Sequence, residues 1–83
     1  MKVDRVFNSK ETKKLQEIIQ STNTIAGKNI LDNNVGKFGE VRVINNTLDN
    51  SMLSLIQHSR IGKEYVIGEI YVSNGELYIR FTF

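Results

Sequence analysis

The chain holds few residues that could do chemistry. It has one histidine, His58, and no cysteine, so a Cys/His nucleophilic pair and the standard structural zinc sites are excluded. The residues before Arg60 predict a helix that carries His58 near its end and just off its apolar stripe. A surface histidine at a helix end is the simpler interpretation of that position. We therefore expect a protein that is not an enzyme, with no catalytic residue, no metal site and no cofactor.

Glycine followed by lysine occurs three times, at Gly27, Gly36 and Gly62. A phosphate-binding loop also needs a glycine five residues before that glycine, and a Ser or Thr after the lysine. Neither condition is met at any of the three positions. These pairs therefore give no support to a nucleotide-binding loop.

The strongest structural signal is Asn74-Gly75, which stands between two β-rich runs and predicts a two-residue type I′ turn. We expect a C-terminal β-hairpin over residues 64–83, and the turn fixes its register. Counting back from the turn gives the strand pairs Val72–Leu77, Tyr71–Tyr78, Ile70–Ile79, Glu69–Arg80 and Gly68–Phe81.

Side chains alternate along each strand, so this register divides the hairpin into two faces. The face expected to join the core carries Val66, Gly68, Ile70, Val72, Leu77, Ile79, Phe81 and Phe83. The other face carries the residues that we expect to bind a partner, which are Tyr65, Ile67, Tyr71, Tyr78 and Arg80.

The second face predicts a protein partner. When helices cover one face of a sheet, the other face is exposed to water unless something else covers it. Tyr and Arg are enriched in the hot spots of protein interfaces, and Tyr71, Tyr78 and Arg80 lie together in the expected register. An alternative is that residues 23–39 fold over this face, which would place the tyrosines in a second core.

A different class of function rests on a basic cluster. Lys10, Lys13 and Lys14 stand on the exposed side of the first expected helix, where a solubilising surface is the simpler interpretation. Together with Arg80 and the tyrosines, these lysines could instead form a nucleic-acid or nucleotide-binding surface. Strong salt dependence of binding would favour that alternative.

The N-terminal half predicts a helix and a long packed segment. A short first strand is expected at Val3–Phe7. Asn8 and Glu11 then form a capping box, which starts a helix over residues 9–21. Residues 23–39 are rich in glycine and asparagine, so we expect them to be irregular, although their apolar residues should pack on the domain.

The alternating stretch over residues 40–44 predicts a strand with Val41 and Val43 facing inward. A second helix should begin at residue 47 or 49 and end at Gly62. The expected fold is a small α+β domain over residues 1–83. It is a two-layer sandwich in which two helices pack on one face of an antiparallel sheet of three to four strands.

Composition limits the remaining choices. The chain is 40% hydrophobic and carries a net charge of +2, values typical of one folded domain. No apolar run is long enough to cross a membrane, and the expected location is the cytoplasm. Much Asn and Ile without Pro or Trp is typical of AT-rich coding sequences, including those of phages. We expect a small protein that occludes or sequesters a partner, for example a phage or mobile-element inhibitor of a host defence protein. A homodimer is compatible with the sequence.

Overall fold

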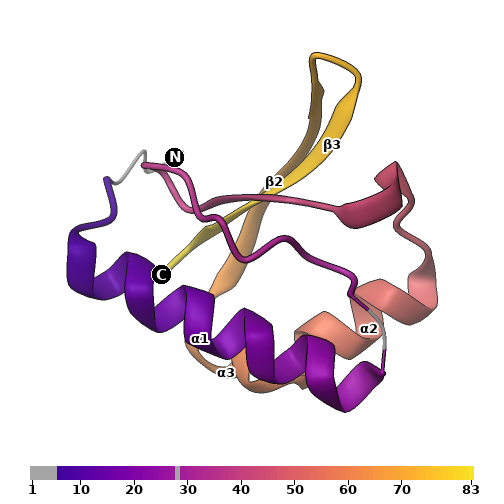
Figure 1. Cartoon of the computed structure of the whole chain (residues 1–83), viewed down its shortest axis with the longest axis horizontal. Helices are drawn as coiled ribbons and strands as arrows, with labels where there is room; N and C mark the ends of the chain where they lie inside the picture. The colour runs from indigo at the N-terminus through magenta and orange to yellow at the C-terminus, as the bar shows by residue number, and fades with distance from the viewer. Residues whose placement is uncertain (1–5, 28) are drawn as a thin grey trace.

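The computed structural model describes residues 6–27 and 29–83, and it has the expected α+β class (Figure 1). Its antiparallel sheet has three strands in the order β1–β3–β2, and β2 and β3 form the C-terminal hairpin. In chain order the elements are α1 (Ser9–Ala26), β1 (Glu40–Arg42), the 3₁₀ helix η1 (Ile44–Asn46), α2 (Asn50–His58), α3 (Arg60–Glu64), β2 (Val66–Ser73) and β3 (Glu76–Thr82).

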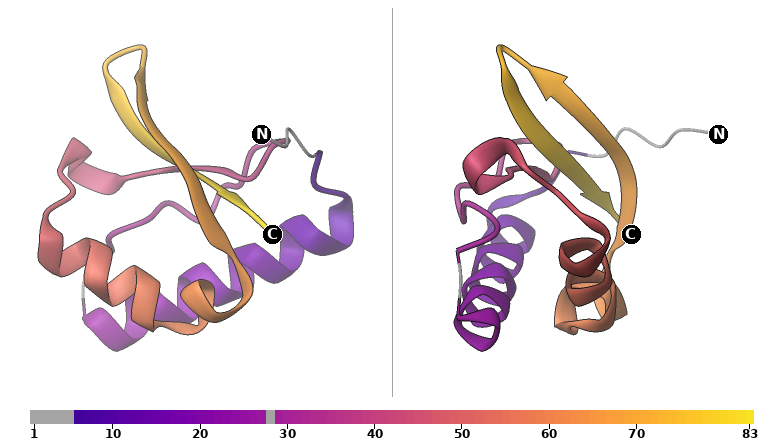
Figure 2. Two further views of the ribbon diagram at one scale, coloured as in Figure 1. Left: turned by 180° about the vertical axis from the view of Figure 1, so that it is seen from behind. Right: turned by 90° about the vertical axis from the view of Figure 1, so that its right-hand side faces the viewer.

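The α-helices form one layer below the sheet, with α1 beside the α2–α3 pair (Figure 2). The turn end of the hairpin projects away from this layer in every view (Figures 1 and 2). The core between the layers is made of buried side chains from Phe7, Leu15, Ile18, Ile19, Ile30, Leu31, Val41, Val43, Ile56, Ile61, Tyr65, Ile79 and Phe81. Within the described residues, no helix is both long and apolar enough to span a membrane.

The start of α1 is the expected capping box. The side chain of Asn8 accepts a hydrogen bond from the amide of Glu11 (2.8 Å), and the Glu11 carboxylate accepts from the amide of Asn8 (3.1 Å). The helix continues beyond the expected residue 21, because Thr22 still lies on its buried side. It ends at Gly27, which takes the left-handed conformation (φ 66°) that favours glycine.

The expected first strand, Val3–Phe7, is not a strand where it can be observed. Residues 3–5 lie outside the described part of the chain, and Val6 and Phe7 belong to no strand. The amide of Phe7 donates to the carbonyl of Lys37 (2.7 Å), and its ring joins the core. A single backbone bond of this kind anchors the chain without making it a strand of the sheet.

Residues 23–39 were expected to be packed and irregular, but residues 23–26 instead continue α1. Segment 29–36 is irregular and runs along the outer edge of β1. Leu31 forms an isolated antiparallel bridge with Val43, and the amide of Asp32 donates to the carbonyl of Arg42 (2.9 Å). Both Val41 and Val43 are buried as expected, although β1 is shorter than predicted because η1 begins at Ile44.

The single second helix expected before Gly62 is wrong, because two helices meet at Ser59. The Ser59 hydroxyl donates to the carbonyl of Ile56 (2.7 Å), which ends α2, and accepts from the amide of Ile61 (3.2 Å), which starts α3. Gly62 lies inside α3 and does not end a helix. A β-carbon there would stand 1.8 Å from the carbonyl oxygen of Gln57, so the close approach of the two helices requires glycine.

The hairpin turn and most of its register are confirmed. Asn74 and Gly75 have positive φ angles of 52° and 76°, and every expected pair from Val72–Leu77 to Glu69–Arg80 is present. Beyond that point a β-bulge inserts Gly68, so Ile67 lies opposite Phe81 in place of Gly68.

The bulge exchanges the two faces at the start of β2. Tyr65 and Ile67 were expected on the exposed face, but Tyr65 is only 8% exposed and Ile67 packs against the core. Val66 was expected in the core and is 63% exposed. The predicted exposure of Tyr65 and Ile67 is therefore wrong, because one extra residue in a strand turns every side chain before it to the opposite face.

Candidate binding surface on the sheet

The three strands place a continuous row of polar and aromatic side chains on the side of the sheet away from the helices. Strand pairing aligns Glu40 with Arg80 and Glu69, and it aligns Arg42 with Tyr78 and Tyr71. The alternate residues Val41 and Ile79 are fully buried toward the helices. We call the opposite side the open face, and its residues are Glu40, Arg42, Glu69, Tyr71, Ser73, Glu76, Tyr78 and Arg80.

Two tyrosines form the centre of the open face. The rings of Tyr71 and Tyr78 are stacked, with centroids 5.6 Å apart and planes inclined by 16°. Both side chains are half-buried, so part of each ring is accessible. Aromatic pairs of this kind are rigid, because each tyrosine has only two side-chain torsions and the neighbouring ring restricts both.

Both phenols remain protonated at neutral pH. Burial raises the pKa of Tyr71, and nearby Glu40 raises it further. A hydrogen bond that the Tyr78 hydroxyl donates to Glu76 (3.1 Å) raises the pKa of Tyr78. The tyrosines are therefore neutral hydrogen-bonding groups with aromatic surface, and they cannot serve as phenolate bases near pH 7.

The two arginines of the open face are held by carboxylates. Arg80 pairs with Glu69 on β2, and Arg42 pairs with Asp32 at 3.1 Å. Arg80 is the more buried of the two side chains, with 19% of its surface exposed. These pairs hold the guanidinium groups beside the tyrosines.

The open face is slightly acidic. It carries three glutamates (Glu40, Glu69 and Glu76) against two arginines (Arg42 and Arg80), which gives a formal charge of −1. Asp32 adds a further negative charge beside Arg42. The modest basic excess of the chain therefore lies elsewhere.

The structure separates the predicted lysine cluster from the tyrosines. Lys10, Lys13 and Lys14 lie on α1, which is in the helical layer on the other side of the sheet (Figure 2). Lys10 and Lys13 are exposed, and Lys14 forms an ion pair of 3.0 Å with Glu64 on α3. These lysines do not share a surface with Tyr71.

Of the five predicted partner-binding residues, Tyr71, Tyr78 and Arg80 come together on the open face. Tyr65 belongs instead to an aromatic cluster in which its ring lies 6.2 Å from Phe7 and 5.8 Å from Phe83. Ile67 is half-buried beside the core. The two groups are divided by the bulge at Gly68.

Sequence reasoning did not assign Glu40 and Arg42 to the candidate surface. The alternation of residues 40–44 does indicate that both point away from the core. It does not indicate that β1 pairs with β3 in the register that brings Arg42 beside Tyr78. That pairing joins residues far apart in the chain, and no local signal encodes it.

Segment 29–36 does not cover the tyrosines. It lies beyond β1, so β1 and β3 stand between it and Tyr71 on β2. Residues 23–26 belong to α1 in the helical layer. The alternative in which residues 23–39 fold over this face is therefore wrong for the part of this range that the structure describes.

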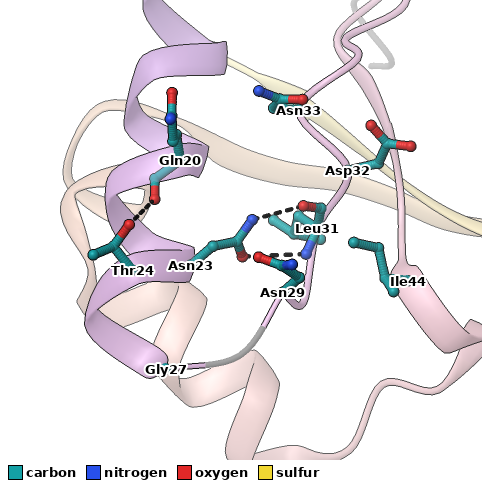
Figure 3. Close-up of a pocket in the computed structure, with 9 residues that line it drawn as sticks. All are labelled: Gln20, Asn23, Thr24, Gly27, Asn29, Leu31, Asp32, Asn33 and Ile44. Carbon is teal, nitrogen blue, oxygen red and sulfur yellow. Dashed lines mark hydrogen bonds between the residues drawn. The ribbon is translucent and has the colours of Figure 1, made fainter.

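A polar groove of about 590 Å³ lies elsewhere, between α1 and segment 29–33 (Figure 3). Its central amide, Asn23, donates to the carbonyl of Leu31 (2.7 Å) and accepts from the amides of Ile30 (3.1 Å) and Leu31 (3.3 Å). Figure 3 shows the bonds between Asn23 and Leu31 crossing from the helix to the segment. Asn23 thus fastens the chain after α1 and leaves little of the amide for a ligand.

The remaining chemical groups are dispersed. His58 is exposed at the end of α2, where its Nδ1 lies 2.8 Å from the carbonyl oxygen of Ser54. Among residues 6–27 and 29–83, no group of three or more His, Asp or Glu side chains could hold a metal ion. The open face brings stacked tyrosines and carboxylate-paired arginines together on one surface.

Comparison with known proteins adds no relative, because no family model, no curated protein and no solved structure matches this chain.

Proposed function

We propose that this chain is a non-enzymatic binding protein that occludes or sequesters a partner protein through its open face. The observation that carries the proposal is the stacked pair of Tyr71 and Tyr78 on a sheet face that no helix of residues 6–27 and 29–83 covers. Tyrosine is one of the residues most enriched in binding hot spots, because one side chain offers apolar area and a hydrogen-bonding hydroxyl.

Preorganisation supports this assignment. Arg80 and Arg42 are already fixed by Glu69 and Asp32, and the Tyr78 hydroxyl is already bonded to Glu76. A partner that docks here does not have to immobilise these side chains, which saves about 0.5–1.5 kcal/mol for each one. A rigid surface of this kind suits a protein whose action is to cover a site on its partner.

The charge of the open face favours a protein over a nucleic acid. A phosphate backbone is bound by concentrated positive charge. The open face has a formal charge of −1, and its arginines are engaged by carboxylates. The exposed Lys10 and Lys13 lie behind the sheet and cannot neutralise phosphates that approach the tyrosines.

An inhibitor of a host protein, carried by a phage or mobile element, is the biological setting that we propose for such a protein. Its composition, with nine Asn and ten Ile among 83 residues, is typical of AT-rich coding sequences. Inhibition by occlusion needs no catalytic group, and its strength depends only on how well the surface fits the partner.

Affinity capture with matched variants tests the proposal. The tagged chain is used to capture proteins from a lysate of its host cell, with and without nuclease, at two salt concentrations. We expect one protein to be retained by the unmodified chain and lost by the double variant Tyr71→Ala/Tyr78→Ala. The matched control is Lys10→Ala/Lys13→Ala, which changes two exposed side chains on the opposite layer and should retain the partner.

The reverse pattern would overturn the proposal. If the lysine variant loses the captured material, the tyrosine variant keeps it, and nuclease removes it, the chain binds nucleic acid through α1. Circular dichroism of both double variants verifies that each remains folded, so that a loss of binding can be assigned to the surface.

A further inference from the structure

The two outer edges of the sheet differ in whether other backbone pairs with them. The edge of β1 is covered by segment 29–36, which forms the bridge between Leu31 and Val43 and further backbone bonds. Where β3 extends past the end of β1, its edge is also hydrogen-bonded, because the amide of Leu77 donates to the side chain of Asn46 (3.2 Å). Among the described residues, no strand or bridge pairs with the outer edge of β2.

Hydrogen bonds around β3 show which groups of β2 face this free edge. The carbonyl of Leu77 accepts from Val43 (2.8 Å) and the amide of Phe81 donates to Gly39 (3.0 Å), so these residues face away from β2. Backbone groups alternate along an antiparallel strand, so Tyr78 and Arg80 bond to β2, at Tyr71 and Glu69 respectively. The backbone groups of Ile70 and Val72 therefore point outward from the free edge.

The same two residues expose apolar side chains. Ile70 is 43% exposed and Val72 is 69% exposed, because the hairpin projects beyond the helices that would otherwise cover them (Figure 2). Protected edge strands usually carry lysine, proline or an inward-pointing charge, and residues 70–73 have none of these. The bulge at Gly68 bounds the pairing segment on one side and the turn bounds it on the other.

We propose that this edge binds a second copy of the chain, antiparallel, with the two-fold axis at Tyr71. Ile70 then lies opposite Val72 of the partner subunit, and these two residues direct their backbone groups toward each other. Antiparallel pairing in this register forms about four backbone hydrogen bonds between the subunits. On one face it also covers the exposed part of Ile70 with the partner's Val72.

Charge placement selects a second copy as the occupant. Glu69 is the one charged residue in the segment from Glu69 to Ser73. With the axis at Tyr71, each Glu69 lies opposite Ser73 of the partner subunit, so the two carboxylates are kept apart. An axis at Glu69 would bring the carboxylates together, and an axis at Ile70 would require pairing within the bulge at Gly68. The segment is thus complementary to itself in the register that uses its whole length.

The dimer would contain one continuous sheet of six strands, three from each copy. A two-fold axis perpendicular to the sheet keeps the helices of both copies on one side and their open faces on the other. Tyr71 would then adjoin Tyr71 of the partner subunit, extending the stack that Tyr78 begins. This inference does not depend on the proposed function, although the dimer would double the open face.

Sedimentation equilibrium of the full chain over a range of concentrations tests self-association. We expect a monomer–dimer equilibrium for the unmodified chain. Val72→Lys should weaken it by about tenfold or more, because a lysine at an edge loses the apolar contact and resists strand pairing. The matched control is Val66→Lys, which changes a valine of similar exposure (63%) on the other side of the bulge and should still dimerise.

Amide hydrogen exchange identifies the interface directly. We expect the amides of Ile70 and Val72 to exchange more slowly as the chain dimerises, because each gains an acceptor on the partner subunit. A chain that stays monomeric up to about 1 mM would overturn the inference, since an association of only about 4 kcal/mol would already be detected there. So would a dimer that survives Val72→Lys, or one that leaves these two amides unprotected. Protection of them only by a different protein would also overturn it.

Discussion

At the residue scale, we propose that Tyr71 and Tyr78 bind a partner through the aromatic area of their rings and not through ionisation of their phenols. Both phenols are protonated at neutral pH, because burial raises the pKa of Tyr71 and the bond to Glu76 raises that of Tyr78. Tyr71→Phe should therefore keep most of the affinity for the partner. Tyr71→Ala should lose roughly 2 kcal/mol of binding free energy, or about thirtyfold. Calorimetric titration with the captured partner measures the affinity of both variants. An equal loss of affinity in both would show that binding depends on the hydroxyl.

Tyr65 is buried and contributes instead to the stability of the fold, and this contribution depends on pH. Burial raises the pKa of this phenol above its ordinary value of 10.0, and the positive charge of Lys14 opposes the shift in part. The folded state therefore keeps a proton that the unfolded state loses near pH 10. The corresponding stability is complete below that pH and is lost as the pH rises through the higher pKa of the folded state.

We expect the free energy of unfolding to fall as the pH rises above about 10, and Tyr65→Phe to reduce the slope in that range. Urea unfolding at several pH values measures it. Tyr65→Phe keeps the contacts of the ring with Phe7 and Phe83, so packing is conserved and the comparison isolates the phenol. An unchanged slope would show that the Tyr65 hydroxyl is as well solvated in the folded chain as in the unfolded one.

At the scale of elements, the junction of α2 and α3 requires a residue without a side chain at one position. A β-carbon at Gly62 would stand 1.8 Å from the carbonyl oxygen of Gln57, so Gly62→Ala must push the two helices apart. We expect a loss of about 1–3 kcal/mol in unfolding free energy. Gly68→Ala is the matched control, because its β-carbon would meet its nearest neighbour at an ordinary 3.4 Å. Thermal unfolding measures the stability of both variants. If the two are equally stable, the two helices do not approach each other as closely as described.

Part of the hairpin could be predicted from the sequence alone, and part could not. The turn at Asn74-Gly75 needs positive φ angles that few other residue pairs adopt easily, so it predicted the hairpin and its register as far as Glu69. The bulge at Gly68 has no such local signal. It exchanged the faces before Glu69 and placed Tyr65 in the core.

The candidate site was predictable to the same extent. Tyr71, Tyr78 and Arg80 were identified because the turn register alone brings them together. Arg42 reaches them only through the pairing of β1 with β3, a contact between segments distant in sequence. The break at Ser59 escaped prediction because Gly62 was interpreted as the end of one helix, although the apolar spacing of that helix stops at Ile56. The packing of α3 on α2 reveals two helices.

At the scale of the whole molecule, the two layers divide the charges. The helical layer carries the exposed Lys10 and Lys13, whereas the open face is slightly acidic and centred on stacked tyrosines. One side of the sheet is thus occupied by the core, and none of the helices in the described residues covers the other side. The hairpin that projects beyond the helices extends this open side at the unpaired edge of β2 (Figures 1 and 2).

Site-specific photocrosslinking in the host cell tests the open face as the binding surface most directly. A photoreactive phenylalanine analogue is placed at Tyr71 in one version of the chain and at the exposed Lys13 of α1 in another. We predict a discrete crosslink from position 71 to a protein other than a second copy of the chain, and none from position 13. A crosslinked protein from position 13 alone would contradict the account and place the binding surface on the helical layer.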